Sequence, residues 1–418
     1  MFDNLFLWLY LLIKFNEMIL IPAYITLTLL WLSMLFISCS KREKSDLASN
    51  RIPKIKALNM TSAIEEFPKL SVEYVNSKKN KIDAFYRKNW VSKNKSISFL
   101  VAKDGQIIYE KYEGYANIEK KKPITCNTPI HIASVSKVLT ATVILKLINA
   151  GKLNLDQKVN TILKDFPYPE ITIKTLLNHR SGMRNYAYFT SERGIWDRHK
   201  TITNQDVLDL MISKKIQLEY KTDTRFTYCN TNYAILALII EKTTNSSYKE
   251  AMKTMIFEPL GMKNTFVYDH KNDQDSVTPS YRCSGRKIGY DYLDAVYGDK
   301  NIYATPRDLL KFDMARNSSS FLDPKLNDQI YEGYSNEHRG KKNYGLGIRM
   351  IQWPTGQEFY FHNGWWHGNM SSYITLKNEN VMMVALTNRG YKQVYKTKNL
   401  APLFGDYPFK LSGDDREE

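Results

Sequence analysis

Cysteine is scarce in this chain, and its four cysteines do not form the closely spaced pairs that bind zinc. The sequence therefore predicts no metal site, and no other motif calls for a cofactor. A disulfide among Cys126, Cys229 and Cys283 stays open, because spacing alone does not determine pairing. An internal repeat is also missing, which argues against a repeat architecture.

Runs of basic residues are missing too, although the formal net charge is +16 and the pI is about 9.3. Lysine and arginine are scattered, and no nucleic-acid recognition motif occurs. This favours a basic soluble surface and no nucleic-acid partner. The rival hypothesis, a DNA binder, predicts an affinity that falls steeply with salt.

What is present is enough apolar sequence for a large folded body. The chain has 418 residues, of which 43% are hydrophobic. We assign the folded domain to residues 72–411, preceded by a charged tether over 40–71 and followed by a flexible tail over 412–418.

Residues 1–39 are predicted to lie outside the fold. The stretch from Met18 to Cys39 carries no charge and is long enough to cross a bilayer. Its end, Leu35-Phe-Ile-Ser-Cys-Ser-Lys-Arg, resembles a bacterial lipoprotein signal in which Cys39 would be lipidated. Cleavage with lipidation and a retained spanning helix both stay open, and Met18 is a second possible start. Either way, we expect an extracytoplasmic body in a bacterial envelope, tethered to a membrane through its N-terminus.

The pattern along the body predicts an α+β fold. A hairpin with an Asp104-Gly105 turn is expected over 97–112, followed by a mostly helical middle with an apolar helix over 231–243. Strand-like runs then occupy 344–353, 358–362, 370–376 and 381–387. The predicted architecture is an antiparallel sheet built from both chain ends, flanked by helices, with a mostly helical inserted lobe.

One helix in this plan carries reactive side chains. The apolar segment 129–151 is predicted to be a buried helix that begins at Ser134 and ends before Gly151. Ser134 and Lys137 are three residues apart, so their side chains face the same way. Burial disfavours the charged form of a lysine, and a neutral amine can take the proton of a neighbouring hydroxyl.

Ser-x-x-Lys alone is a weak signal. Other copies lie at Ser38, Ser92, Ser246 and Ser284, but only the Ser134 copy opens a long apolar helix. Tyr-x-Asn also occurs elsewhere, at Tyr74, Tyr115 and Tyr334, and Tyr228-Cys-Asn230 is chosen because it directly precedes the apolar helix. Standing alone, it would indicate a packed tyrosine followed by a helix-capping Asn230.

Several such segments occur together and in order, and their combination is specific. They are Ile132-Ala-Ser-Val-Ser-Lys137, Leu176-Leu-Asn-His-Arg-Ser-Gly182, Phe226-Thr-Tyr-Cys-Asn230, Phe257-Glu-Pro-Leu-Gly-Met262, Tyr344-Gly-Leu-Gly347 and Phe361-His-Asn-Gly364. From about Ser96 to Asn388 the chain resembles the serine β-lactamase and penicillin-binding-protein superfamily. The resemblance is to its class C-like branch of D-alanyl-D-alanine carboxypeptidases, class C β-lactamases and related esterases.

This resemblance implies a β-lactamase/transpeptidase-like fold and an acyl-enzyme on Ser134. Lys137 and Tyr228 would handle the proton, and Asn230 would orient Lys137 or hold a substrate amide. His179 is interpreted as structural.

The resemblance also places the segment His362-Asn-Gly364 beside the nucleophile. Gly364 would leave room for substrate, His362 would face it, and the backbone N–H groups of Ser134 and Trp365 would form the oxyanion hole. Penicillin-type members have a lysine at the position of His362 and a small residue at that of Trp365. Both departures argue against efficient β-lactam hydrolysis.

The sequence therefore predicts a hydrolase of amide or ester bonds in small molecules or peptides, including cell-wall peptides. Two alternatives remain. One is a true β-lactamase, which would turn over nitrocefin. The other is a catalytically silent envelope binding protein of the same fold, which a fluorophosphonate probe would not label.

Overall fold

The computed structural model describes residues 67–91, 95–337, 340 and 342–411. The predicted signal with Cys39, nearly all of the tether and the tail over 412–418 lie outside these residues. Within the described part, no helix is both long and apolar enough to cross a bilayer.

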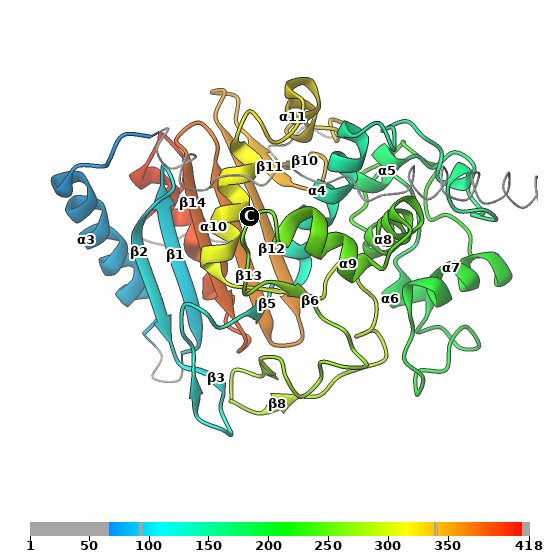
Figure 1. Ribbon diagram of the computed structural model, residues 1–418, viewed down its shortest axis with the longest axis horizontal. Helices are drawn as coiled ribbons and strands as arrows, with labels where there is room; N and C mark the ends of the chain where they lie inside the picture. The colour runs from blue at the N-terminus through cyan, green and yellow to red at the C-terminus, as the bar shows by residue number, and fades with distance from the viewer. Residues whose placement is uncertain (1–66, 92–94, 338–339, 341, 412–418) are drawn as a thin grey trace, which may run out of the picture. The chain divides into compact units, whose positions relative to one another are not determined.

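A seven-stranded antiparallel sheet forms the centre of the fold (Figure 1), in the order β10-β11-β12-β13-β14-β1-β2. The N-terminal hairpin joins the C-terminal strands through the pairing of β1 with β14. The predicted sheet from both chain ends is therefore confirmed. Its strands are β1 Ile97–Lys103, β2 Gln106–Glu113, β10 Lys342–Tyr344, β11 Arg349–Gln352, β12 Glu358–Trp366, β13 Asn369–Leu376 and β14 Val381–Thr387.

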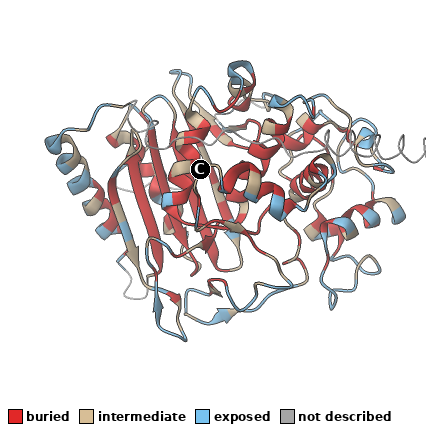
Figure 2. Ribbon diagram, in the orientation of Figure 1, coloured by how far each residue is buried: buried red, intermediate tan, exposed pale blue. Residues whose placement is uncertain are grey.

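Alternate residues of the central strands enter two separate cores, as the two-residue period of a strand requires. In β1, Phe99 and Val101 pack in the core under α3 (Val72–Asn89) and η4 (Lys392–Leu403). Leu100 and Ala102 point the other way, into the larger core with α10 (Pro306–Asn317). Figure 2 shows the central strands buried throughout, while the outer side of α3 is exposed.

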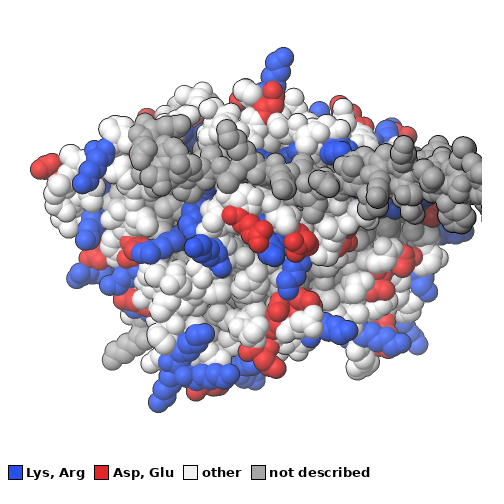
Figure 3. Space-filling view, viewed as in Figure 1, with Lys and Arg blue, Asp and Glu red and all other residues white. Residues whose placement is uncertain are grey.

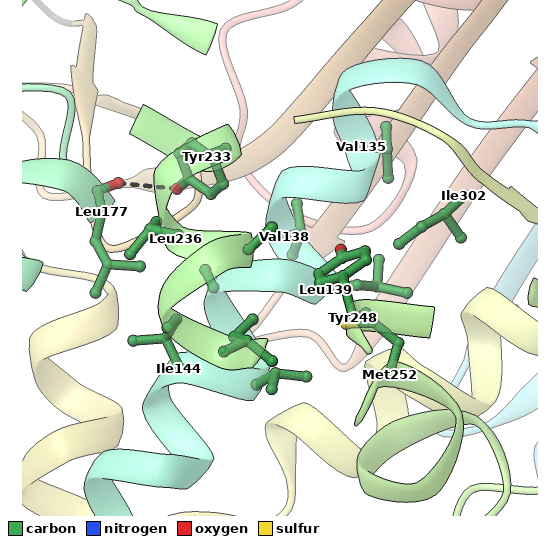
Figure 4. Close-up of a cluster of buried hydrophobic side chains, with 14 of the residues drawn as sticks. Val135, Val138, Leu139, Ile144, Leu177, Tyr233, Leu236, Tyr248, Met252 and Ile302 are labelled. Atoms are coloured by element: carbon green, nitrogen blue, oxygen red, sulfur yellow. Dashed lines mark hydrogen bonds between the residues drawn. The ribbon is translucent and has the colours of Figure 1, made fainter. Parts of the chain in front are cut away.

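The inserted lobe packs around two buried helices, α4 (Ser136–Asn149) and α8 (Asn230–Thr244). Figure 4 shows their apolar side chains in contact, and Tyr233 Oη donates a hydrogen bond to Leu177 O (2.9 Å). Smaller helices complete the lobe: α5 Ile173–Leu177, α6 Tyr186–Phe189, α7 Asn204–Ser213, α9 Tyr248–Met252 and, beside the sheet, α11 Pro324–Ile330. The short strands are β3 Tyr115–Asn117, β4 Lys122–Pro123, β5 Ile130–His131, β6 Phe266–Val267, β7 Ser280–Tyr281, β8 Lys287–Ile288 and β9 Ile302–Ala304.

The helix predicted to begin at Ser134 begins two residues later, at Ser136. Earlier in the same segment, residues 130–131 form β5, and the turn η1 (Ala133–Val135) separates that strand from α4. Ala133 has a φ of +47°, which an α-helix does not accommodate. Ser134 therefore lies in a tight turn before the helix, while Gly151 ends it as expected, with a φ of +66°.

The predicted strand over 344–353 is two strands, β10 and β11. A Cβ on Gly345 would lie 2.0 Å from Ile330 O, and one on Gly347 would lie 2.3 Å from Ala141 Cβ of α4. The chain can approach its neighbours so closely only because both residues lack a side chain. Both glycines lie in the turn that joins β10 to β11 as an antiparallel hairpin, and the close approach at Gly347 brings this turn next to α4.

Surface charge and cysteine chemistry follow the sequence. On the face shown in Figure 3, lysine and arginine are interspersed with aspartate and glutamate rather than gathered in one patch. Cys126, Cys229 and Cys283 are free thiols, so the open question of a disulfide among them is answered in the negative.

Candidate active site

Ser134 is presented by a turn that a buried histidine stabilises. The backbone N–H of Ala133 donates to His131 Nδ1 (3.1 Å), and His131 Nε2 lies 3.1 Å from Asn301 Oδ1. Burial lowers the pKa of His131 to about 4, so the ring is neutral near pH 7 and can accept this bond. The histidine therefore supports the positive φ directly before the nucleophile.

Lys137 points at Ser134 from the first turn of α4. Its Nζ lies 3.2 Å from Ser134 Oγ and donates a second hydrogen bond to Asp299 O (2.8 Å). The lysine has no exposed surface. The predicted juxtaposition of the hydroxyl and the amine is thus present, and the carbonyl of Asp299 holds the amine in place.

Tyr228 lies beside this pair. The centre of its ring is 5.1 Å from Lys137 Nζ and 4.5 Å from the guanidinium carbon of Arg349. Two basic side chains thus flank one phenol, and Tyr228 is only partly buried. The structure therefore brings Ser134, Lys137 and Tyr228 into one cluster, although their catalytic roles stay predictions.

His179 supports the tyrosine segment from behind. Its Nδ1 accepts from Cys229 N (3.2 Å) and contacts Asn232 Nδ2 (3.1 Å), and its ring centre is 4.4 Å from that of Tyr228. Burial and the charge of Lys137 hold the pKa of His179 well below its usual value. These contacts fit the structural role predicted for His179.

Asn230 is the first residue of α8. Its Oδ1 is buried and accepts no hydrogen bond from any described residue. Buried amide oxygens are usually paired, so this one is available to an incoming N–H group. Its position is compatible with the predicted contact to a substrate amide.

Strand β12 runs directly past the nucleophile. A Cβ on Gly364 would lie 2.5 Å from Ile132 O and 2.9 Å from Ser134 N. Only glycine permits this approach, which brings the backbone of the next residue, Trp365, close to that of Ser134. The oxyanion hole predicted from these two N–H groups stays a prediction.

His362 is not at the surface of the site. It is fully buried, Tyr344 Oη lies 3.2 Å from its Nε2, and its Nδ1 lies 2.9 Å from Asn363 O. Burial, with the nearby charges of Arg349 and Lys137, holds the pKa of His362 well below its usual value. In this conformation His362 is neutral and faces no solvent, and its predicted contact with substrate stays a prediction.

Trp365 is the exposed aromatic residue at this strand end. It is 67% exposed, and its indole N–H donates to His367 O (2.8 Å), which fixes the ring. A rigid, exposed aromatic ring next to the nucleophile can contact a substrate.

Sequence reasoning missed both Arg349 and the carbonyl of Asp299. Neither stands in a recognisable motif. The pairing of β11 with β12 places Arg349 opposite Phe361, and Asp299 acts through its backbone carbonyl. A carbonyl leaves no signature in sequence, so only the fold could reveal it.

A separate cavity of about 830 Å³ lies on another part of the molecule. It includes neither Ser134, Lys137 nor Tyr228, and its lining includes Tyr168, Asn178, Arg180, Thr222 and Tyr334. The chemistry of the nucleophile, not cavity volume, identifies the active site.

Known proteins are similar to this chain in sequence and in fold. The sequence pattern of the beta-lactamase family matches residues 83–403. A penicillin-binding protein of Bacillus subtilis is 30% identical over 306 residues, which are 69% of this chain and 67% of that protein. A teichoic acid D-alanine hydrolase of Staphylococcus aureus is 27% identical over 302 residues, 71% of each chain. The solved structure of an octameric penicillin-binding protein homologue from Pyrococcus abyssi aligns with a TM-score of 0.66 and 26% identity, covering 80% of this chain and 78% of that one.

Proposed function

The chain belongs to the beta-lactamase family and is a serine hydrolase, and from this premise we propose that it releases a D-amino acid from an amide or ester through an acyl-enzyme on Ser134. The observation that carries the proposal is the 3.2 Å contact between Ser134 Oγ and the buried Lys137 Nζ, next to Tyr228. The teichoic acid D-alanine hydrolase of Staphylococcus aureus, to which the chain is similar, acts by its name on D-alanine of teichoic acid.

The reaction proceeds in two steps. Ser134 Oγ attacks the substrate carbonyl carbon, and its proton passes to the amine of Lys137 or to Tyr228 and from there to the leaving nitrogen or oxygen. The carbonyl–leaving group bond breaks, leaving an ester on Ser134. Water then adds to this ester, gives its proton back through the same residues, and releases the acid. N–H groups of Ser134 and Trp365 would stabilise the oxyanion in both steps.

Arg349 supports a substrate with a negative charge near the scissile bond. The residues that the structure describes provide no acidic partner for Arg349, which lies over the ring of Tyr228 instead. Since His362 is neutral, Arg349 is the cation close to the tyrosine besides Lys137. A carboxylate of the leaving D-amino acid would pair with it.

Replacing Arg349 with glutamine is therefore expected to raise KM for a D-alanyl-D-alanine peptide roughly 10–100-fold, because a charged hydrogen bond is lost. The corresponding D-alanine amide or ester without a carboxylate should change less than threefold. Steady-state kinetics on this substrate pair measure the difference. Arg307→Gln is the control, since Arg307 pairs with Glu110 and contacts no site residue. Equal losses on both substrates would contradict the proposed role of Arg349.

We also propose that the protein acts outside the cytoplasm, tethered through its N-terminus, because Met18 to Cys39 is uncharged and ends in a lipoprotein-like segment. If Cys39 is lipidated, a clickable fatty acid fed to the cells should label the wild type and not Cys39→Ala. No labelling of the wild type would exclude lipidation of Cys39 as the anchor, and retention of a spanning helix would then be the remaining form of tether.

A further inference from the structure

A buried lysine that the proposed mechanism does not use lies behind the site. Lys300 Nζ donates to Tyr186 Oη (2.6 Å) and lies 3.6 Å from Asp299 Oδ1. Tyr186 Oη in turn donates to Asp299 Oδ2 (2.9 Å). The side chains of Lys300 and Asp299 are only 3% and 2% exposed.

Such a buried pair is a poor way to stabilise a core. Removing two charges from water costs about as much as their attraction returns, and apolar residues of similar volume are often as stable. What an ion pair does provide is a defined geometry, because it restrains the atoms that carry the charge. We call Lys300, Asp299 and Tyr186 the Lys300 cluster. The contacts of this cluster show which parts of the site it restrains.

The Lys300 cluster touches three separate segments of the site. The carbonyl of Asp299 receives the hydrogen bond from Lys137 Nζ. Lys300 Nζ lies 4.7 Å from the ring centre of Trp366, directly after Trp365 on β12. Tyr186 N donates to Thr231 Oγ1 (2.7 Å), directly after Asn230 on α8.

A fourth contact comes from the residue that follows Lys300. Asn301 has a φ of +72°, and its Oδ1 lies 3.1 Å from His131 Nε2, while His131 Nδ1 accepts from Ala133 N. Three consecutive residues, 299 to 301, therefore reach the general base, the strand end at Trp366 and the turn of the nucleophile.

We propose that Lys300 is a positioning residue: its ammonium ties Asp299, Tyr186 and Trp366 together, and so keeps Lys137 and the β12 backbone aligned with Ser134. This inference rests on the proposed function, because it assumes that Ser134 is the nucleophile. Lys300 touches neither substrate nor a reacting atom, and its effect passes through the carbonyl of Asp299 and the ring of Trp366.

The test compares Lys300→Met with two further variants. Lys300→Arg keeps the charge, and Lys311→Met is the matched control, because Lys311 forms a similar pair with the buried carboxylate of Asp308 (2.9 Å) on α10. The rate of Ser134 labelling by a fluorophosphonate and the kcat and KM on a chromogenic D-alanine ester are measured. All rates are expressed per folded molecule, with the folded fraction taken from near-UV circular dichroism.

For Lys300→Met we expect labelling and kcat to fall roughly 10–100-fold, since a displacement of about 1 Å costs that much, with KM changed less than threefold. Lys300→Arg should react at least tenfold faster than Lys300→Met, and Lys311→Met should react like wild type. If Lys300→Met does not fold, Asp299→Asn replaces it, because this variant removes the ion pair and keeps the carbonyl.

The decisive comparison is between Lys300→Met, or Asp299→Asn in its place, and the control Lys311→Met. If both variants react at equal rates per folded molecule, the inference is overturned and Lys300 has a purely structural role. A wild-type protein that the probe does not label would instead overturn the proposed function, so the two failures are distinguishable.

Discussion

Ser134→Ala is expected to abolish fluorophosphonate labelling and to lower kcat/KM by roughly 10⁴–10⁶-fold, because the variant has no atom that can form the acyl-enzyme. Ser134 Oγ has Lys137 Nζ as its hydrogen-bond partner and lies in the turn before α4. Folding should be little affected, and the melting temperature should stay within a few degrees of wild type. Intact-mass spectrometry after reaction with the probe measures the labelling directly.

The sequence provides its own control for this experiment. Ser246 and Lys249 form another Ser-x-x-Lys copy, but Ser246 Oγ contacts Thr244 Oγ1 (3.0 Å) at the end of α8, away from Lys137. Ser246→Ala should label at the wild-type rate. Labelling of Ser134→Ala at the wild-type rate would show that another residue is the nucleophile, and the proposed acyl-enzyme would be wrong.

Lys137→Met is expected to lower both the labelling rate and kcat by roughly 10²–10⁴-fold, the range for loss of a general base. The methionine fills the same buried space but cannot take the proton of Ser134. Single-turnover kinetics with a chromogenic ester separate acylation from deacylation. We expect both steps to slow because each includes a proton transfer through Lys137.

Lys146→Met is the matched control, since Lys146 lies on the same helix and its Nζ donates to Phe321 O (3.0 Å), far from Ser134 along α4. Burial lowers the pKa of Lys146 to about 8, so it too is a partly desolvated lysine. If both lysine variants lost activity equally, the loss would reflect damage to α4 and not the removal of a base.

Much of the fold could be predicted from local patterns. The turn at Asp104-Gly105, the helix start at Thr305-Pro306 and the alternating strands of the C-terminal half all depend on residues near one another in the sequence. The errors arose where a distant segment decides the local conformation. Ala133 adopts a positive φ because His131 and Asn301 support it, and β10 ends where Gly345 meets Ile330.

The surroundings of His362 could not be read from the sequence for the same reason, and its predicted contact with substrate stays untested. A histidine before Asn-Gly on a strand can face either side. Tyr344 and Asn363 occupy both of its ring nitrogens, and burial keeps the ring neutral. The cation near Tyr228 is instead Arg349, which reaches the site from a neighbouring strand.

By itself, the sequence determined that Ser134 and Lys137 lie three residues apart, close enough for their side chains to meet, since spacing along the chain is a local property. Only the tertiary structure decided what holds them: the carbonyl of Asp299 on Lys137, the backbone of Gly364 against Ser134, and the buried charge of Lys300 behind them. Backbone carbonyls and close approaches are common to every residue type, so their roles emerge only when the folded chain brings distant segments together.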